Sequence, residues 1–143
     1  LGLPPDFETC SRDTYPAGTV FSLSYSLNVL KGIASACRHL HERGLAHGDI
    51  YAHNILTNDV GHSLLGDFGA ASFYDRTKDK TRERLDIRAF GYLIEDLLKH
   101  AEQGSDSAVI AKLQNLQRLC LNENITERPV FAEVCDIMRV IYS

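Results

Sequence analysis

Hydrophobic residues recur every three or four positions in four stretches of the chain, the spacing that places them on one face of a helix. This pattern predicts helices over about residues 22–43, 84–101, 109–120 and 129–141. Ser22 can cap the first helix and Gly44 can end it, while Pro129 suits the opening turn of the last. The apolar side of the second helix comprises Leu85, Phe90, Leu93, Ile94, Leu97 and Leu98.

Between residues 45 and 73 the helical spacing gives way to short apolar runs. The runs 55–56 and 63–65 are separated by residues 58–61, whose Asn, Asp and Gly favour a turn. We therefore expect a two-stranded hairpin, which would bring Asn54 and Asp67 to the same end of the strand pair. Four helices and one hairpin make the expected fold class mainly α with a small β-hairpin.

The rest of the chain is predicted to be loops. Residues 1–21 hold three of the four prolines and form a loop-rich entry segment, and residues 22–143 form one domain. Residues 74–83 are almost wholly polar, so we expect a solvated loop there. The chain begins with Leu1 rather than Met, which favours a fragment or a processed product.

Composition excludes several classes of protein. A net charge of −4 argues against a surface for nucleic acid or anionic membrane, and no apolar run approaches the ~20 residues of a membrane span. None of the four cysteines, Cys10, Cys37, Cys120 and Cys135, forms a C-x-x-C pair, and the last three fall in apolar helical stripes. They are expected to be buried, reduced thiols, which indicates a cytoplasmic location.

The candidate chemistry lies around the predicted hairpin, in His47-Gly48-Asp49, Asn54 and Asp67-Phe68-Gly69. Asp49 can accept a hydrogen bond from an attacking hydroxyl and orient it. Asn54 and Asp67 supply oxygen ligands of the kind Mg²⁺ prefers, with phosphates filling the other positions. Gly69 would let the chain turn sharply after Asp67. Positioned oxygens of this kind are what phosphoryl transfer requires.

Other interpretations of the same residues stay open. His47, Asp49 and His53 could form a Zn²⁺ site, although no fourth ligand is evident. The motifs could also be fortuitous on a helical scaffold. His39 and His41 lie two residues apart on a helix and cannot share a ligand, so both are expected to be surface or boundary residues.

Taken together, these motifs resemble the protein kinase superfamily. Residues 47–54 are similar to the H-R-D-x-x-x-x-N catalytic loop, and residues 67–69 match D-F-G in full. Residues 86–91 are similar to the D-x-W-x-x-G that opens the central helix of the C-terminal lobe, and Arg128-Pro129 resembles the signature near the end of that lobe. The resemblance covers nearly the whole chain, with residues 1–21 placed just after the hinge. The nearest placement is among bacterial kinases joined to leucine-rich repeats.

The resemblance implies roles for individual residues and ATP with Mg²⁺ as cofactors. Asp49 would be the catalytic aspartate, Asn54 and Asp67 the Mg²⁺ ligands, and Leu56 the apolar floor under adenine. The supporting residues would be His47 and Phe68, which stack in the spine, Gly69, Asp86, which holds the catalytic-loop backbone, and Arg128. Leu56 and Phe68 could instead be ordinary core residues, and Asp86 a helix N-terminal carboxylate favoured by the dipole.

Several departures from the family pattern limit this picture. Gly48 stands where the family has Arg, as in small-molecule kinases that resemble aminoglycoside and choline phosphotransferases, and Tyr51 replaces a lysine that contacts the γ-phosphate. The activation segment is short and lacks A-P-E, so the partner of Arg128 is open, with Glu83 a candidate. The link between the second and third helices also lacks the helix on which protein substrates usually dock.

The N-lobe motifs of the family are absent from this sequence: it has no G-x-G-x-x-G and no strand lysine. We therefore expect the C-lobe of an ATP-dependent kinase of Ser/Thr type, with its N-lobe in cis, a protein or small-molecule hydroxyl acceptor, and no nucleic-acid or membrane partner. The isolated chain would be inactive and bind nucleotide weakly. The alternatives are a small-molecule kinase and a pseudokinase binding module.

Overall fold

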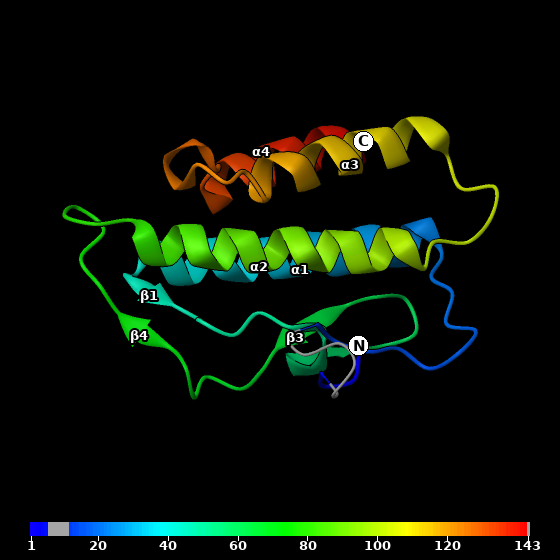
Figure 1. Ribbon diagram of the computed structural model, residues 1–143, viewed down its shortest axis with the longest axis horizontal. Helices are drawn as coiled ribbons and strands as arrows, with labels where there is room; N and C mark the ends of the chain where they lie inside the picture. The colour runs from blue at the N-terminus through cyan, green and yellow to red at the C-terminus, as the bar shows by residue number, and fades with distance from the viewer. Residues whose placement is uncertain (6–11, 143) are drawn as a thin grey trace.

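The computed structural model describes residues 1–5 and 12–142, in which four helices form two layers above a set of short strands (Figure 1). The helices are α1 (Leu23–Glu42), α2 (Thr81–Lys99), α3 (Ser107–Cys120) and α4 (Phe131–Tyr142). The strands are β1 (Leu45–Ala46), β2 (Ile55–Thr57), β3 (Ser63–Leu65) and β4 (Ser72–Phe73). Two short 3₁₀ turns are η1 (Ala52–Asn54) and η2 (Ile125–Glu127). The mainly helical fold class with a small hairpin is confirmed.

The ends of α1 follow the signals in the sequence. The Ser22 hydroxyl accepts a hydrogen bond from the backbone N–H of Tyr25, which satisfies one of the free donors of the first turn. Gly44 follows the helix with φ +71°, a left-handed conformation that glycine adopts without a steric penalty. The predicted helix over 22–43 is therefore confirmed.

Helix α2 begins at Thr81, a turn earlier than predicted. The carboxylate of Asp79 accepts the backbone N–H of Thr81 at 2.8 Å and so supports the early start. Leu85, predicted on the apolar side, is 52% exposed, whereas Glu83 and Asp86 are buried in that first part of the helix. The prediction for Leu85 is wrong because polar partners, rather than apolar packing, set the inward face there.

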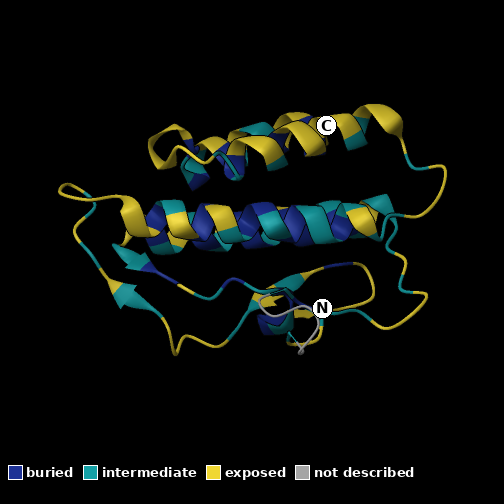
Figure 2. Ribbon diagram, in the orientation of Figure 1, coloured by how far each residue is buried: buried dark blue, intermediate teal, exposed yellow. Residues whose placement is uncertain are grey.

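The core lies between the two helical layers, where the facing sides of the helices are buried (Figure 2). Helix α2 packs on α3 and α1 packs on α4. The rings of Phe90 and Phe131 meet edge-on with centroids 5.4 Å apart, which joins α2 to α4. Both rings are fully buried, so this contact helps to fix how the layers sit on one another.

The strands form two antiparallel pairs on the side of α1 and α2 away from α3 and α4 (Figure 1). The pair β2–β3 is the predicted hairpin, with Leu56 opposite Leu64, and Asn58 accepts the backbone N–H groups of Val60 and His62 in its turn. The pair β1–β4 joins Leu45 to Phe73 and was not predicted. Strands of two residues are too short to give an alternating pattern.

The thiols of Cys37 and Cys120 are buried and that of Cys135 is half-buried, and all three are free, as predicted; Cys10 lies outside the described residues. Burial raises the pKa of Cys120 to about 12 and that of Cys37 well above its ordinary value. Among the helices described, none combines the length and apolarity needed to cross a membrane. The predicted division at residue 21 stays a prediction, and residues 6–11 of that segment are not described.

Candidate phosphoryl-transfer site

The loop from His47 to Asn54 and the end of strand β3 bring three oxygen-bearing side chains into one region. The Asn54 amide donates to both the backbone carbonyl and the Oδ2 atom of Asp49, each at 2.9 Å. The backbone N–H of Gly66 donates to the Asn54 carbonyl at 2.8 Å, which ties residue 54 to the chain just before Asp67. Asp49, Asn54 and Asp67 therefore lie at the same end of the hairpin.

Asp67 is held in an unusual backbone conformation. Its φ is +51°, the one left-handed non-glycine value among the described residues, and its side chain is exposed. Its Oδ1 atom accepts the backbone N–H of Gly69 at 3.2 Å. A turn follows directly after Asp67, as expected, with Gly69 and Ala70 at its centre and the Ala71 N–H donating to the Phe68 carbonyl at 3.0 Å. A Cβ on Gly69 would lie 3.2 Å from Asp67 Oδ1.

His47 and Phe68 contact each other beside this region. The buried His47 ring donates through Nε2 to the Gly66 carbonyl at 2.8 Å and meets the Phe68 ring at 4.9 Å between centroids. Phe68 is 47% exposed, and Leu56, on β2, is 68% exposed. The alternative that Leu56 and Phe68 are ordinary core residues is therefore wrong for this structure.

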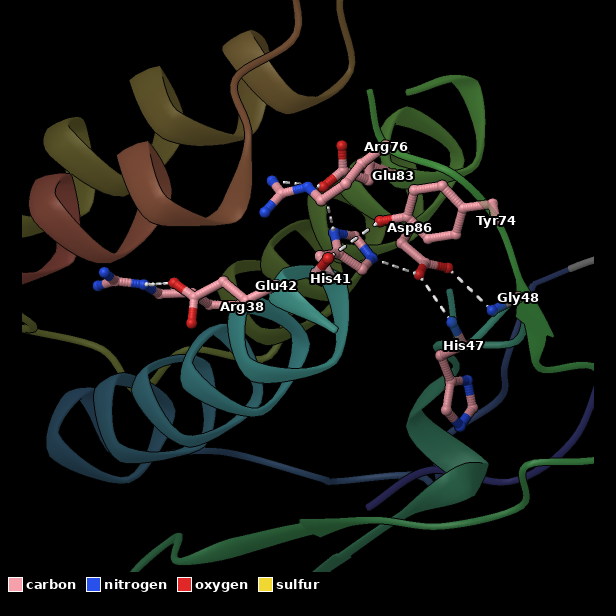
Figure 3. Close-up of polar contacts among 9 residues, drawn as sticks. All are labelled: Arg38, His41, Glu42, His47, Gly48, Tyr74, Arg76, Glu83 and Asp86. Atoms are coloured by element: carbon pink, nitrogen blue, oxygen red, sulfur yellow. Dashed lines mark hydrogen bonds and ion pairs between the residues drawn. The ribbon is translucent and has the colours of Figure 1, made fainter. Parts of the chain in front are cut away.

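Asp86, in the second turn of α2, is hydrogen-bonded to the backbone at the start of the His47–Asn54 loop (Figure 3). Its carboxylate accepts the N–H groups of His47 and Gly48, each at 2.9 Å, and the His41 Nε2–H at 2.8 Å. Asp86 is almost fully buried, and three charge-assisted hydrogen bonds offset the cost of burying a carboxylate. This is a specific anchor for the loop rather than a solvated helix-end carboxylate.

His41 is buried between Asp86 and Glu83, so the prediction of a surface or boundary residue is wrong (Figure 3). Its Nδ1 atom lies 3.7 Å from Glu83 Oε1. Glu83 is itself fully buried and lies 2.8 Å from the guanidinium of Arg76, in the loop before α2. Desolvation, and then the negative charge of Glu83, raises the pKa of the Tyr74 hydroxyl nearby. Residue spacing carries no signal for these pairings, since residues 41 and 86 lie far apart along the chain.

Arg128 does not pair with Glu83. Its Nε donates to the Asn122 carbonyl at 2.8 Å and its Nη1 to the Arg84 carbonyl at 3.1 Å, so it joins η2 to the start of α2. Burial, and then the positive charge of Arg88, lowers the pKa of Arg128. The candidate partner named from the sequence is corrected, because Glu83 is taken by Arg76.

Gly48 and Tyr51, the two residues that depart from the family pattern in this loop, each have defined contacts. Gly48 has φ +82°, and a Cβ on it would lie 2.6 Å from the carbonyl oxygen of Ala70. A side chain at position 48 is therefore incompatible with this path of the chain. The Tyr51 ring stacks on His53, whose Nδ1 and backbone N–H contact Asp13 at 2.9 and 2.8 Å.

These contacts also bear on which ion the site could hold. His53 is directed to Asp13, and the described residues contain no group of three His, Cys, Asp or Glu side chains arranged for a metal. The zinc interpretation thus lacks a ligand set. Asn54 and Asp67 offer oxygen donors alone, and a site with two protein oxygens completed by phosphates fits the way Mg²⁺ is usually bound.

Comparison with known proteins agrees with this arrangement. The family model described as "Protein kinase domain" matches residues 7–109. This match covers most of the chain, so the chain belongs to the protein kinase family.

Curated proteins similar to this chain include plant receptor kinases. The chain is 33% identical over 98 residues to the lectin-domain containing receptor kinase VI.3 of Arabidopsis thaliana, covering 66% of this chain and 14% of that protein. It is 36% identical over 81 residues to the L-type lectin-domain containing receptor kinase SIT1 of Oryza sativa subsp. japonica, covering 54% and 12%. The chain thus spans a small part of these relatives. The placement beside bacterial kinases with leucine-rich repeats stays a prediction.

Proposed function

We propose that this chain is the C-lobe of an ATP-dependent protein kinase of Ser/Thr type, with Asp49 as the catalytic aspartate. The observation that carries the proposal is the pair of hydrogen bonds from the Asn54 amide to Asp49, at 2.9 Å each. These bonds fix the Asp49 carboxylate beside the residues that would hold a metal–nucleotide. Phosphoryl transfer depends mainly on such positioning, because the reaction needs little covalent help from the protein.

In this site the free oxygen of Asp49 accepts the hydrogen of the acceptor hydroxyl and orients its oxygen toward the γ-phosphate. The Asn54 amide nitrogen is engaged with Asp49, which leaves the amide oxygen for the cation. Asp67 presents its exposed carboxylate to the same region. A bound Mg²⁺ would neutralise the charge that develops on the phosphates.

Supporting residues hold this arrangement from two sides. Asp86 fixes the backbone at His47 and Gly48, and the His47–Phe68 contact steadies the chain around Asp67. Leu56, exposed on β2, would contact one face of adenine. The opposite face would be covered by an N-lobe in cis, so the chain of 143 residues on its own is proposed to be inactive. We include a cytoplasmic location in the proposal, which the free thiols of Cys37, Cys120 and Cys135 favour.

A small-molecule kinase is the second candidate. Gly48, in a left-handed conformation, occupies the position where protein kinases have the arginine that binds a phosphorylated loop. A pseudokinase is the third, since Tyr51 stands where a cation would contact the γ-phosphate and stacks on His53 instead. All three candidate functions share the same geometry of Asp49 and Asn54. The kind of acceptor that is phosphorylated, and whether any turnover occurs, therefore distinguish them.

The test is transfer of radiolabelled γ-phosphate by the full-length protein that contains this chain, compared with its Asp49→Ala variant. Protein acceptors, peptides and small hydroxyl compounds are offered in parallel with Mg-ATP. Transfer to seryl or threonyl residues that depends on Asp49 supports the proposal. Asp49-dependent transfer only to small molecules selects the second candidate, and no difference between the two proteins refutes the role of Asp49.

A further inference from the structure

A groove of about 570 Å³ lies between the His47–Asn54 loop and the first half of α2. Its volume falls in the range of about 300–1,000 Å³ that is typical of ligand sites. Gly48, Ile50 and Tyr51 line it on the side of the loop, on either side of Asp49 in sequence. Arg82, Leu85, Arg88 and Tyr92 line it on the side of α2. Gly48 and Ile50 flank Asp49 in sequence, so a molecule in this groove would lie beside the backbone that carries the proposed catalytic aspartate.

The acidic side chains that line the groove already have partners. Asp13 accepts two hydrogen bonds from His53, and Asp86 is occupied by the loop backbone and His41. Asp96 is bound to Arg12 at 2.6 Å and accepts the Tyr15 hydroxyl at 3.0 Å. None of these carboxylates is free to attract a cation.

Two arginines of the groove lack such partners. Within the described part of the chain, no carboxylate lies at ion-pair distance from Arg82 or Arg88. Arg82 is hydrogen-bonded to the Ser72 hydroxyl, and Arg88 donates to the Tyr92 hydroxyl at 3.3 Å; both arginines are exposed. The lining holds as many aspartates as arginines, but Asp13 and Asp86 are buried, so the exposed charges without an ion-pair partner are the two positive ones of Arg82 and Arg88.

Leu85 adds an apolar contact between the two charges. It lies three residues from each arginine, so the three side chains follow one side of α2. Leu85 is 52% exposed and borders the groove together with Tyr92 and Ile50. Two cations with an apolar residue between them match an acidic segment that carries one apolar side chain.

We propose that this groove binds an acidic segment of a protein acceptor, with Arg82 and Arg88 pairing with its carboxylates. Leu85 contacts an apolar side chain of the same segment, and the neighbouring hydroxyl reaches Asp49. This inference rests on the proposed function, because it names the acceptor class of that site. It predicts that a serine flanked by glutamates is preferred over the same serine flanked by glutamines or lysines.

Binding can be measured without turnover, in the full-length protein with Asp49→Asn. The probe is a fluorescein-labelled seryl peptide with glutamates on both sides, followed by fluorescence anisotropy. The double substitution Arg82→Glu and Arg88→Glu should weaken binding about tenfold, since two exposed ion pairs with the peptide are lost. Arg118→Glu is the matched control, because this exposed residue lies on α3, across α2 from the strands (Figure 1).

Equal affinity of the double variant and the parent protein, or an equal loss with Arg118→Glu, would overturn the proposal. Turnover with Mg-ATP and an intact Asp49 gives the second readout, in which the double substitution should raise KM for the glutamate peptide by a larger factor than KM for the glutamine peptide. An unchanged preference for the glutamate peptide over the glutamine peptide in the double variant would contradict the proposal that this groove binds the acceptor. Absence of Asp49-dependent transfer to every acceptor counts against the proposed function, while the binding result still decides the groove.

Discussion

The guanidinium of Arg76 lies 2.8 Å from Oε1 of Glu83, whose side chain is completely buried at the start of α2. The contact has the distance of an ion pair without hydrogen-bond alignment, so neither carboxylate oxygen of Glu83 has a well-aligned donor among the described residues. Glu83 also faces His41, and His41 binds Asp86, which holds the loop backbone (Figure 3). The segment after β4 is thereby connected to the loop that carries Asp49.

Removing Arg76 should leave the Glu83 carboxylate buried without a compensating charge. We expect Arg76→Ala to lower the free energy of unfolding by about 1–3 kcal/mol, less than for a fully buried pair because Arg76 is one-third exposed. Arg139→Ala is the control, since its pair with Asp136 is largely exposed and should change the value by about 0.5 kcal/mol or less. Urea denaturation measures both. Equal losses in the two variants would contradict a structural role for the Arg76–Glu83 pair.

Gly48 should tolerate no side chain. Gly48→Ala puts a Cβ 2.6 Å from the Ala70 carbonyl and also forces alanine into the left-handed region. Gly104 has the same φ of +82° with nothing within 4 Å of its would-be Cβ, so Gly104→Ala reports the backbone cost alone. That cost is about 1–2 kcal/mol, and Gly48→Ala should exceed it by a further ~1 kcal/mol or more for the contact. Thermal unfolding of both variants gives the comparison; a smaller loss for Gly48→Ala would show that the contact with Ala70 is not tight.

Stability should decline at alkaline pH. The unfolded thiol of Cys120 loses its proton near its ordinary pKa of about 9, whereas burial keeps it protonated in the folded protein up to about 12. The folded state then binds more protons, so the free energy of unfolding falls as pH rises from about 9 to 12, by at most about 1.4 kcal/mol per pH unit for this group. Cys120→Val should reduce the slope. Identical slopes for the variant and the parent would contradict the assignment.

The isolated chain should bind nucleotide weakly. Leu56 is 68% exposed, so it can contact one face of adenine. The described residues leave the opposite face of adenine uncovered. Isothermal titration calorimetry of residues 1–143 with Mg-ATP should give a dissociation constant weaker than about 1 mM, corresponding to less than about 4 kcal/mol of binding. Micromolar affinity would mean that this chain needs no further lobe to hold the nucleotide.

Much of the fold was predictable because local signals agreed with one another. Ser22 and Gly44 mark the ends of α1, and the Asn58–Gly61 turn marks the hairpin that brings Asn54 toward Asp67. These signals act over a few residues, which is the range that a single sequence reports reliably. The juxtaposition of Asn54 and Asp67 followed from the hairpin, whereas the position of Asp49 is set by its hydrogen bonds from the Asn54 amide.

The polar network could not be predicted in the same way. His41 is buried by partners far away in sequence, namely Asp86, 45 positions on, Glu83 and the ring of Phe131. Family resemblance suggests Glu83 as a partner for Arg128, but Glu83 pairs with Arg76, which lies in a polar loop. The helical spacing of apolar residues predicts Leu85 on the inward side of α2. Glu83 and Asp86 are buried there instead, and this rotation of the helix leaves Leu85 exposed. Long-range pairs of charged groups decide these positions, and periodicity carries no information about them.

The central claim is that Asp49, held by the Asn54 amide, orients the acceptor hydroxyl for phosphoryl transfer. The most direct test is the single-turnover rate of γ-phosphate transfer by the full-length protein with Asp49→Asn, beside the control Asp59→Asn in the exposed hairpin turn. We predict a loss of about 10²–10⁴-fold for Asp49→Asn, the usual contribution of a positioned acid or base, and no loss for Asp59→Asn. Rates that are equal for the two variants would contradict the claim.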